Sequence, residues 1–131
     1  MRLIIPPVMA HAVPQFGYAP GLACGGSLFM AGQLGRDDAD QVIADPEAQI
    51  TRAWENVLTV LSAAGADVVD IVDVTRFHVG LREHLALYKR VRDRFFGGHT
   101  PPWTAIGASE LSRPGLIVEI KCIAQLPEAS P

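Results

Sequence analysis

Charged residues are scarce in this sequence. They make up 19% of its 131 residues, against roughly 25% in typical soluble domains, whereas apolar residues make up 49%. A chain of this length is sufficient for one domain with a sizeable core, so we expect a single domain over residues 1–131. Such a domain cannot bury every apolar side chain, and its charge-poor surface indicates that another subunit covers part of it.

The sequence also lacks a run of basic residues. Its 11 Lys and Arg are outnumbered by 14 Asp and Glu, which gives a formal net charge of −3. Nucleic-acid backbones attract a concentrated positive charge, so DNA is not expected as a partner and RNA is disfavoured.

Long apolar runs and cysteine-rich motifs are missing as well. No stretch approaches the roughly 20 apolar residues that cross a bilayer, so no membrane partner is expected. The opening Met1–Pro7 has no apolar core of signal-peptide length, which favours a cytoplasmic location. Cys24 and Cys122 are far apart in the sequence, and the histidines show no metal-ligand spacing. Neither disulfides nor a metal site are therefore expected.

Helical periodicity is present in two segments. In the first, Asp45 is a candidate N-cap, Pro46 suits the first turn, and Gly65 is a candidate terminator. In the second, apolar residues recur along one side and a Gly-Gly pair follows. The predicted helices run from Pro46 to Ala64 and from Arg82 or Glu83 to Phe96.

Segments rich in β-branched residues lie before, between and after these helices. The predicted strands are Ser27–Gln33, Ile71–Val79, Thr104–Ala108 and Leu116–Ala124. This order predicts an α+β fold in which a β-sheet has both helices on one face.

The last predicted strand carries charge on one face only. Alternation places Leu116, Val118, Ile120, Cys122 and Ala124 on the core face, and Ile117, Glu119, Lys121 and Ile123 on the other. One interpretation is a solvated pair of Glu119 and Lys121 at the edge of the sheet. The other is a carboxylate in a partly apolar cleft between subunits, where burial raises the pKa of Glu119 and suits it to proton transfer.

Trp103 has two interpretations on sequence alone. It follows Thr100-Pro101-Pro102 and precedes a predicted strand, so it either lines a cleft or wedges between elements. His78, two residues from Arg76 on a strand, is interpreted as a surface or hydrogen-bonded polar residue rather than a catalyst.

The segments taken together resemble the Rid family, also known as the YjgF/UK114 or endoribonuclease L-PSP family. The resemblance extends from about Gly17 to Ala124. It implies a chorismate-mutase-like subunit with a mixed sheet, assembled as a homotrimer with a β-barrel-like core and a ligand cleft at each subunit interface. The matching pieces are Gly17-Tyr18, Leu28–Gln33, Gln49–Val57, Ala63–Gly65, Phe95-Phe96 and Val118–Ile120.

The resemblance also implies a chemistry. Members of the family hydrolyse reactive enamines and imines, such as 2-aminoacrylate, to a 2-keto acid and ammonia without a metal or organic cofactor. A glutamate helps to orient the water, and an N-terminal tyrosine closes the pocket. These residues correspond to Glu119 and Tyr18, and Gly32 matches a glycine at a strand end.

The family's carboxylate-binding arginine has no counterpart here. Its motif aligns with Pro101–Gly107 and places Trp103 at the arginine's position, whereas a gapless count back from Glu119 places Thr104 there. Neither side chain replaces a guanidinium that makes two parallel hydrogen bonds to a carboxylate. We therefore assign Trp103, Thr104 and Ala105 to the substrate site and expect Arg76 or Arg113 to supply any anion contact.

Three functional hypotheses follow. The first is a divergent hydrolase for a larger or more apolar enamine or imine, which is not an efficient 2-aminoacrylate deaminase. The second is a non-catalytic trimer that binds or senses a small metabolite. The third is the nuclease or translation inhibitor of the family's older labels, which the acidic composition disfavours.

Overall fold

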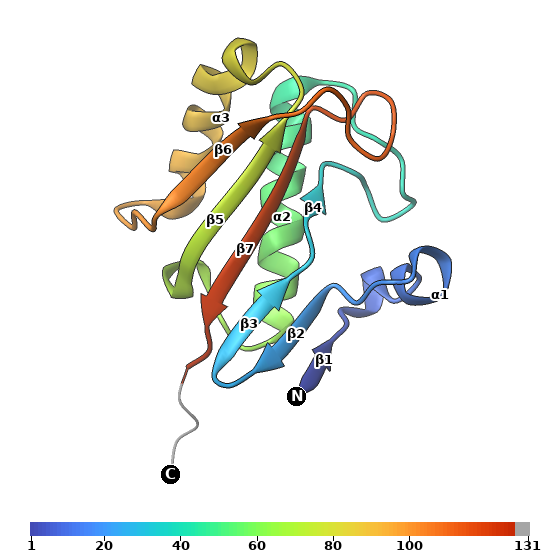
Figure 1. Cartoon of the computed structure of the whole chain (residues 1–131), viewed down its shortest axis with the longest axis vertical. Helices are drawn as coiled ribbons and strands as arrows, with labels where there is room; N and C mark the ends of the chain where they lie inside the picture. Colours follow the sequence, from blue (N-terminus) through green and yellow to red (C-terminus); the bar gives the residue numbers. More distant parts are fainter. Residues whose placement is uncertain (128–131) are drawn as a thin grey trace.

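The computed structural model describes residues 1–127, which form a sheet with helices on one side (Figure 1). The predicted single domain also includes residues 128–131, which lie outside the described residues. The strands are β1 Arg2–Ile4, β2 Gly21–Cys24, β3 Ser27–Met30, β4 Gln33–Leu34, β5 Ile71–His78, β6 Trp103–Gly107 and β7 Val118–Gln125. The helices are α1 Ala12–Phe16, α2 Pro46–Ala63 and α3 Leu81–Phe96, with 3₁₀ turns η1 Pro7–Met9 and η2 Val68–Asp70.

The strands form one mixed sheet. Their order is β1-β2-β3-β7-β5-β6, and the short β4 pairs with β7. Strands β5 and β6 are parallel and are connected through α3, whereas the other pairs are antiparallel. The predicted α+β class is confirmed. The Glu119–Lys121 pair does not lie at the edge of the sheet, because β7 lies between β3 and β5.

Helix α2 forms where the sequence predicts it. The side chain of Asp45 accepts a hydrogen bond from the Ala48 amide at 2.9 Å, which satisfies one of the free donors of the first turn. Ile50, Trp54, Val57 and Leu61 of its apolar stripe are fully buried, and Leu58 is partly buried. The rings of Trp54 and of Phe96 on α3 pack edge to face, with their centres 4.9 Å apart. The two helices therefore pack on each other as well as on the sheet.

The two faces of the sheet differ in what covers them. Helices α2 and α3 cover one face (Figure 1), where the predicted core residues of β7 are buried. The other, which we call the open face, carries Glu119 and Lys121 among apolar side chains. Leu3, Phe29 and Ile106 on this face are 57%, 46% and 42% exposed. Part of the apolar surplus of the sequence therefore lies on the open face.

Two local predictions need correction. The predicted strand Ser27–Gln33 is interrupted after Met30, because the chain leaves β7 and rejoins it further along as β4. The N-terminal β1, α1 and β2 were not predicted, since each is too short to show a period.

The hairpin between β2 and β3 turns through Gly25 and Gly26. Their φ angles of 60° and 79° are in the left-handed region, which glycine adopts without steric cost. Cys24 at this turn is partly exposed and Cys122 on β7 is buried; both are free thiols.

Candidate functional site

Glu119 projects from the middle of the sheet onto the open face. It pairs with Leu34 on one side and with Phe77 on the other. The side chain is half-buried, and this burial raises the pKa of its carboxyl group above the usual 4.5, with nearby Lys121 acting in the opposite direction. Glu119 therefore holds a proton more readily than an exposed glutamate.

Gly32 provides the space that Glu119 occupies. A Cβ atom at position 32 would lie 2.7 Å from the carboxyl carbon of Glu119, which is closer than two such atoms approach. Because β4 starts at Gln33, Gly32 stands at the gap between β3 and β4. The break in the predicted strand thus brings backbone, rather than a side chain, against the carboxylate.

A cavity of about 400 Å³ opens beside Glu119. We call it the Glu119 cavity. Four of the predicted site residues line it, together with Arg36, which the sequence analysis missed: the five are Tyr18, Gly32, Arg36, Arg113 and Glu119. Residues from both ends of the chain therefore meet at one place.

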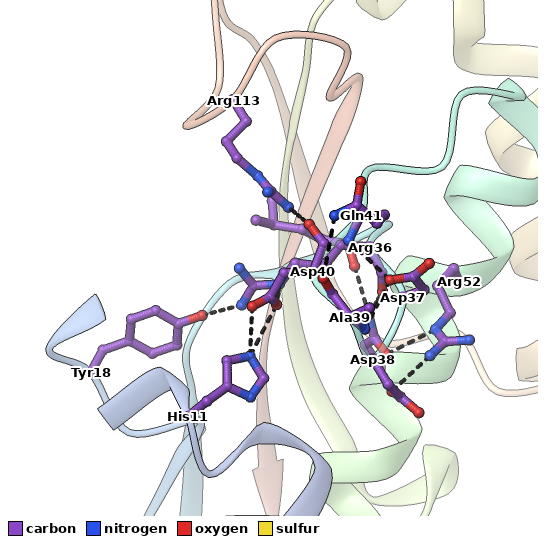
Figure 2. A network of polar contacts seen from close by, with 12 residues as sticks. His11, Tyr18, Arg36, Asp37, Asp38, Ala39, Asp40, Gln41, Arg52 and Arg113 are labelled. Atoms are coloured by element: carbon purple, nitrogen blue, oxygen red, sulfur yellow. Dashed lines mark hydrogen bonds and ion pairs between the residues drawn. The ribbon is translucent and has the colours of Figure 1, made fainter. Parts of the chain in front are cut away.

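A polar network fixes the cationic wall of this cavity (Figure 2). Arg36 donates a hydrogen bond to the Tyr18 hydroxyl at 2.5 Å, and its Nε lies 3.6 Å from Asp40. Asp40 also lies 2.9 Å from Nε2 of His11, and its backbone carbonyl accepts a hydrogen bond from Arg113. Arg36 lies in a loop that carries no recognisable motif. The sequence therefore does not indicate that Arg36 contacts Tyr18 and Asp40 beside the cavity.

The remaining predicted residues lie elsewhere in the same chain. On the edge strand β6, Trp103 pairs with Val74 and shares its helix-covered face, opposite to the face of Glu119. Ala105 pairs with Arg76 on that face and is partly buried, whereas Thr104 is exposed on the open face. Within one chain, the residues predicted for one cleft thus divide into two groups.

Trp103 lines a second and larger cavity of about 630 Å³, which we call the Trp103 cavity. Arg76 and Tyr88 form its floor, and Arg82, Lys89 and Arg92 of α3 contribute to its wall. Trp103 is 54% exposed and borders this cavity, as the cleft-lining interpretation expects.

Arg76 is held between two aromatic rings. Its guanidinium carbon lies 4.0 Å from the ring centre of Tyr88 and 4.3 Å from that of Trp103. Its Nε donates a hydrogen bond to Nε2 of His78 at 3.0 Å, which places the imidazole proton on Nδ1. Burial, and then the positive charge of Arg76, lower the pKa of His78 from 6.5 to about 4. His78 is thus a buried neutral acceptor rather than a surface residue.

Comparison with known proteins identifies the family. The model of the endoribonuclease L-PSP family matches residues 9–126. The chain belongs to this family. Residues 9–126 include both cavities, so the Glu119 and Trp103 cavities lie within the family domain.

Individual family members agree with this assignment. The RutC family protein YjgH of Escherichia coli is 32% identical over 129 residues, which is 97% of each chain. A Salmonella typhimurium protein named 2-iminobutanoate/2-iminopropanoate deaminase is 31% identical over 110 residues, 82% of this chain and 85% of its own.

Solved structures show the same fold. The structure of protein YjgH has a TM-score of 0.90 at 30% identity and covers 98% of both chains. Escherichia coli TdcF with bound serine has a TM-score of 0.78 at 28% identity. The match covers 84% of the chain described here and 88% of TdcF.

Residues 1–127 contain neither a candidate metal cluster nor a membrane-spanning helix. No group of three His, Cys, Asp or Glu side chains is placed to hold a metal ion. No helix in this part of the chain has the length and apolar character to span a bilayer.

Proposed function

We propose that this protein hydrolyses a reactive enamine or imine in a cleft between the subunits of a homotrimer. Glu119 orients and deprotonates the attacking water, whose oxygen forms a bond to the imine carbon. The proton taken by Glu119 goes to the nitrogen, which gives an amino alcohol; an enamine reaches the same point after its tautomerisation to the imine. Glu119 then moves the hydroxyl proton to the nitrogen, and the C–N bond breaks as the C=O bond forms, which releases ammonia and the keto product. Family membership and the deaminase name of one relative support this class of reaction.

The half-buried carboxylate of Glu119 is the observation on which this proposal chiefly rests. A general base works best when its pKa is close to the working pH, and burial moves the pKa of Glu119 in that direction. The carboxylate also borders an open cavity rather than an ion pair, so a water molecule has access to it. Arg36 and Arg113 also line this cavity, where their positive charge favours an anionic substrate.

The homotrimer accounts for the separation of the two groups of site residues. The Glu119 cavity and the Trp103 cavity are each open to solvent and lie on opposite faces of one sheet. A symmetric ring brings one surface of a subunit against a different surface of the next. In the proposed assembly, the Glu119 cavity of one subunit therefore faces the Trp103 edge of its neighbour.

We infer the class of substrate from Trp103. A tryptophan has an apolar face and one N–H donor. Next to Trp103, an apolar group of the substrate is therefore favoured over a carboxylate group. We expect faster turnover of the imine released from phenylalanine by an L-amino acid oxidase than of 2-aminoacrylate. Ammonia release, measured over the uncatalysed rate, checks this order, and the reverse order would contradict the assignment of Trp103.

Replacing Glu119 tests the mechanism itself. Glu119→Gln keeps the size of the side chain but removes the base, and we expect the rate to fall roughly 10²- to 10⁴-fold. Glu110→Gln, in an exposed loop, is the matched control and should retain full activity. An active Glu119→Gln protein would refute the proposed role.

The alternative is a non-catalytic binding protein, which the loss of the family's arginine favours. It predicts that a small metabolite raises the melting temperature while no product forms with any imine. RNA cleavage that persists on repurification and disappears in a Glu119 variant would instead support the nuclease hypothesis.

A further inference from the structure

The guanidinium of Arg76 is an unusual group to bury. Arg76 is 3% exposed, and within residues 1–127 it forms no ion pair with a carboxylate. A buried charge is costly unless it is paired. Tyr88 and Trp103 cover the two faces of the guanidinium and His78 accepts from Nε, so the part left for a counterion is the edge that carries the terminal nitrogens.

The Trp103 cavity reaches Arg76, and all of its charged lining residues are cationic. Its charged lining residues are Arg76, Arg82, Lys89 and Arg92, and no acidic side chain lines it. Lys89 and Arg92 are bound to Asp93, at 3.0 and 2.9 Å, but this exposed carboxylate is not part of the cavity wall. The cavity therefore keeps an excess of positive charge toward any ligand inside it.

Trp103 adds a flat apolar surface to this charge. Leu85 and Ala86 extend it on the side of α3. A ligand that fits must combine an anionic group, which meets Arg76, with a flat or apolar part, which packs on Trp103. A cavity of about 630 Å³ accommodates such a molecule, whereas a bare inorganic anion would leave most of it empty.

The geometry points to a binding site for organic carboxylates with a flat apolar group, in which the terminal nitrogens of Arg76 hold the carboxylate. This inference rests on the proposed function in one respect, since the carboxylate would be that of the imino acid substrate. Arg76 pairs with Ala105, two residues beyond Trp103, and its guanidinium reaches the indole ring. Arg76 on the neighbouring strand β5 thus supplies the positive charge that the family's arginine would supply at position 103.

The intrinsic fluorescence of the protein provides a direct binding assay. Of the two tryptophans, Trp54 is fully buried in the core and Trp103 lies exposed on Arg76. Benzoate serves as the probe, its neutral isostere benzamide as the ligand control, and inorganic phosphate as the anion control. We expect benzoate to change the Trp103 emission at roughly ten- to hundredfold lower concentration than benzamide or phosphate, because a charged contact and a stacking contact act together.

Variants locate the carboxylate. Arg76→Met should weaken benzoate binding roughly ten- to hundredfold, and Arg76→Lys should weaken it less because the charge remains. Arg90→Met removes a charge from α3, outside the cavity, and should change binding less than about twofold, since exposed charges are screened. Should Arg76→Met fail to fold, Arg92→Met tests the cavity, because the Arg92 side chain lines it and is only 16% exposed. We expect a loss of a fewfold, and unchanged benzoate binding would overturn the inference.

Several results would overturn the inference. Equal binding of benzoate and benzamide would show that no cation takes part, and phosphate binding as tight as that of benzoate would exclude the flat subsite. Equal losses in Arg76→Met and Arg90→Met would reduce the effect to net charge. Benzoate binding is measured by fluorescence and requires no turnover, so a failure of the Arg76 site and a failure of the proposed catalysis are separate results.

Discussion

Two titratable side chains, Glu119 in its cavity and His78 behind Arg76, have pKa values that burial shifts more than any other contribution. Burial disfavours the charged form of each group: it raises the pKa of Glu119 and lowers the pKa of His78. Both penalties lower the free energy of unfolding in a range of pH that follows from the direction of each shift. Stability measurements therefore test these assignments without a substrate.

Glu119→Gln should stabilise the protein at neutral pH. Because the folded pKa of Glu119 lies above its unfolded value, its unfavourable contribution is absent below pH 4.5 and develops as the pH rises through the folded pKa. Denaturant unfolding at pH 7 and pH 4 should show a gain from the substitution at pH 7 only. A loss of stability at pH 7 would show that the carboxylate is held by favourable contacts instead.

His78 should make the protein sensitive to mild acid. Its folded pKa of about 4 is below the unfolded 6.5, so the unfolded chain binds the proton first and stability falls between these two values. The loss is at most about 3 kcal/mol, since one pKa unit corresponds to about 1.36 kcal/mol. His78→Gln retains an acceptor for Arg76 but does not titrate, so its denaturation midpoint should decline less between pH 7 and pH 4.5. Equal declines would contradict the prediction.

At the level of elements, Gln49 ties helix α2 to the loop that carries Arg113. The fully buried Gln49 side chain donates to the carbonyls of Ile43 and Gly115 at 2.8 and 2.9 Å, and it accepts from the Ile117 amide at 2.7 Å. One side chain thereby satisfies three backbone groups, one shortly before α2 and two shortly after Arg113. The position of Arg113 at the Glu119 cavity depends on this connection.

Gln49→Leu should destabilise the protein by about 2–4 kcal/mol, because each buried backbone group left without a partner costs about 1–3 kcal/mol. The same substitution at the exposed Gln15 should change the free energy of unfolding by less than about 0.5 kcal/mol. Denaturant unfolding measures both. A neutral Gln49→Leu would mean that water replaces the side chain.

Across the whole molecule, the open face is the surface that lacks a cover. Phe29 and Ile106 expose large apolar side chains on it. Under the proposed assembly, sedimentation at micromolar concentration should give three times the chain mass. Phe29→Glu or Ile106→Glu should shift the protein toward the monomer, whereas Val69→Glu, at an exposed site on η2, should not. A stable monomer would contradict both the homotrimer and the composite cleft.

The sequence predicts those parts of the molecule that depend on local periodicity. Alternation correctly placed Glu119 opposite the core residues of β7, and the stripe of α2 identified the buried face of that helix. Arg76 could not be predicted as buried, because an arginine on an alternating strand resembles a solvent-facing residue. The rings that cover it, Tyr88 and Trp103, come from elements far along the chain.

The unequal burial of the two thiols makes the chain easy to label at one position. Burial raises the pKa of Cys122 to about 12, so that thiol does not react with maleimides at neutral pH. Cys24 is partly exposed beside the Gly25-Gly26 turn, away from both cavities. A spin label attached there without further mutagenesis would report one label-to-label distance in a closed threefold ring, and a spread of distances in an open chain of subunits.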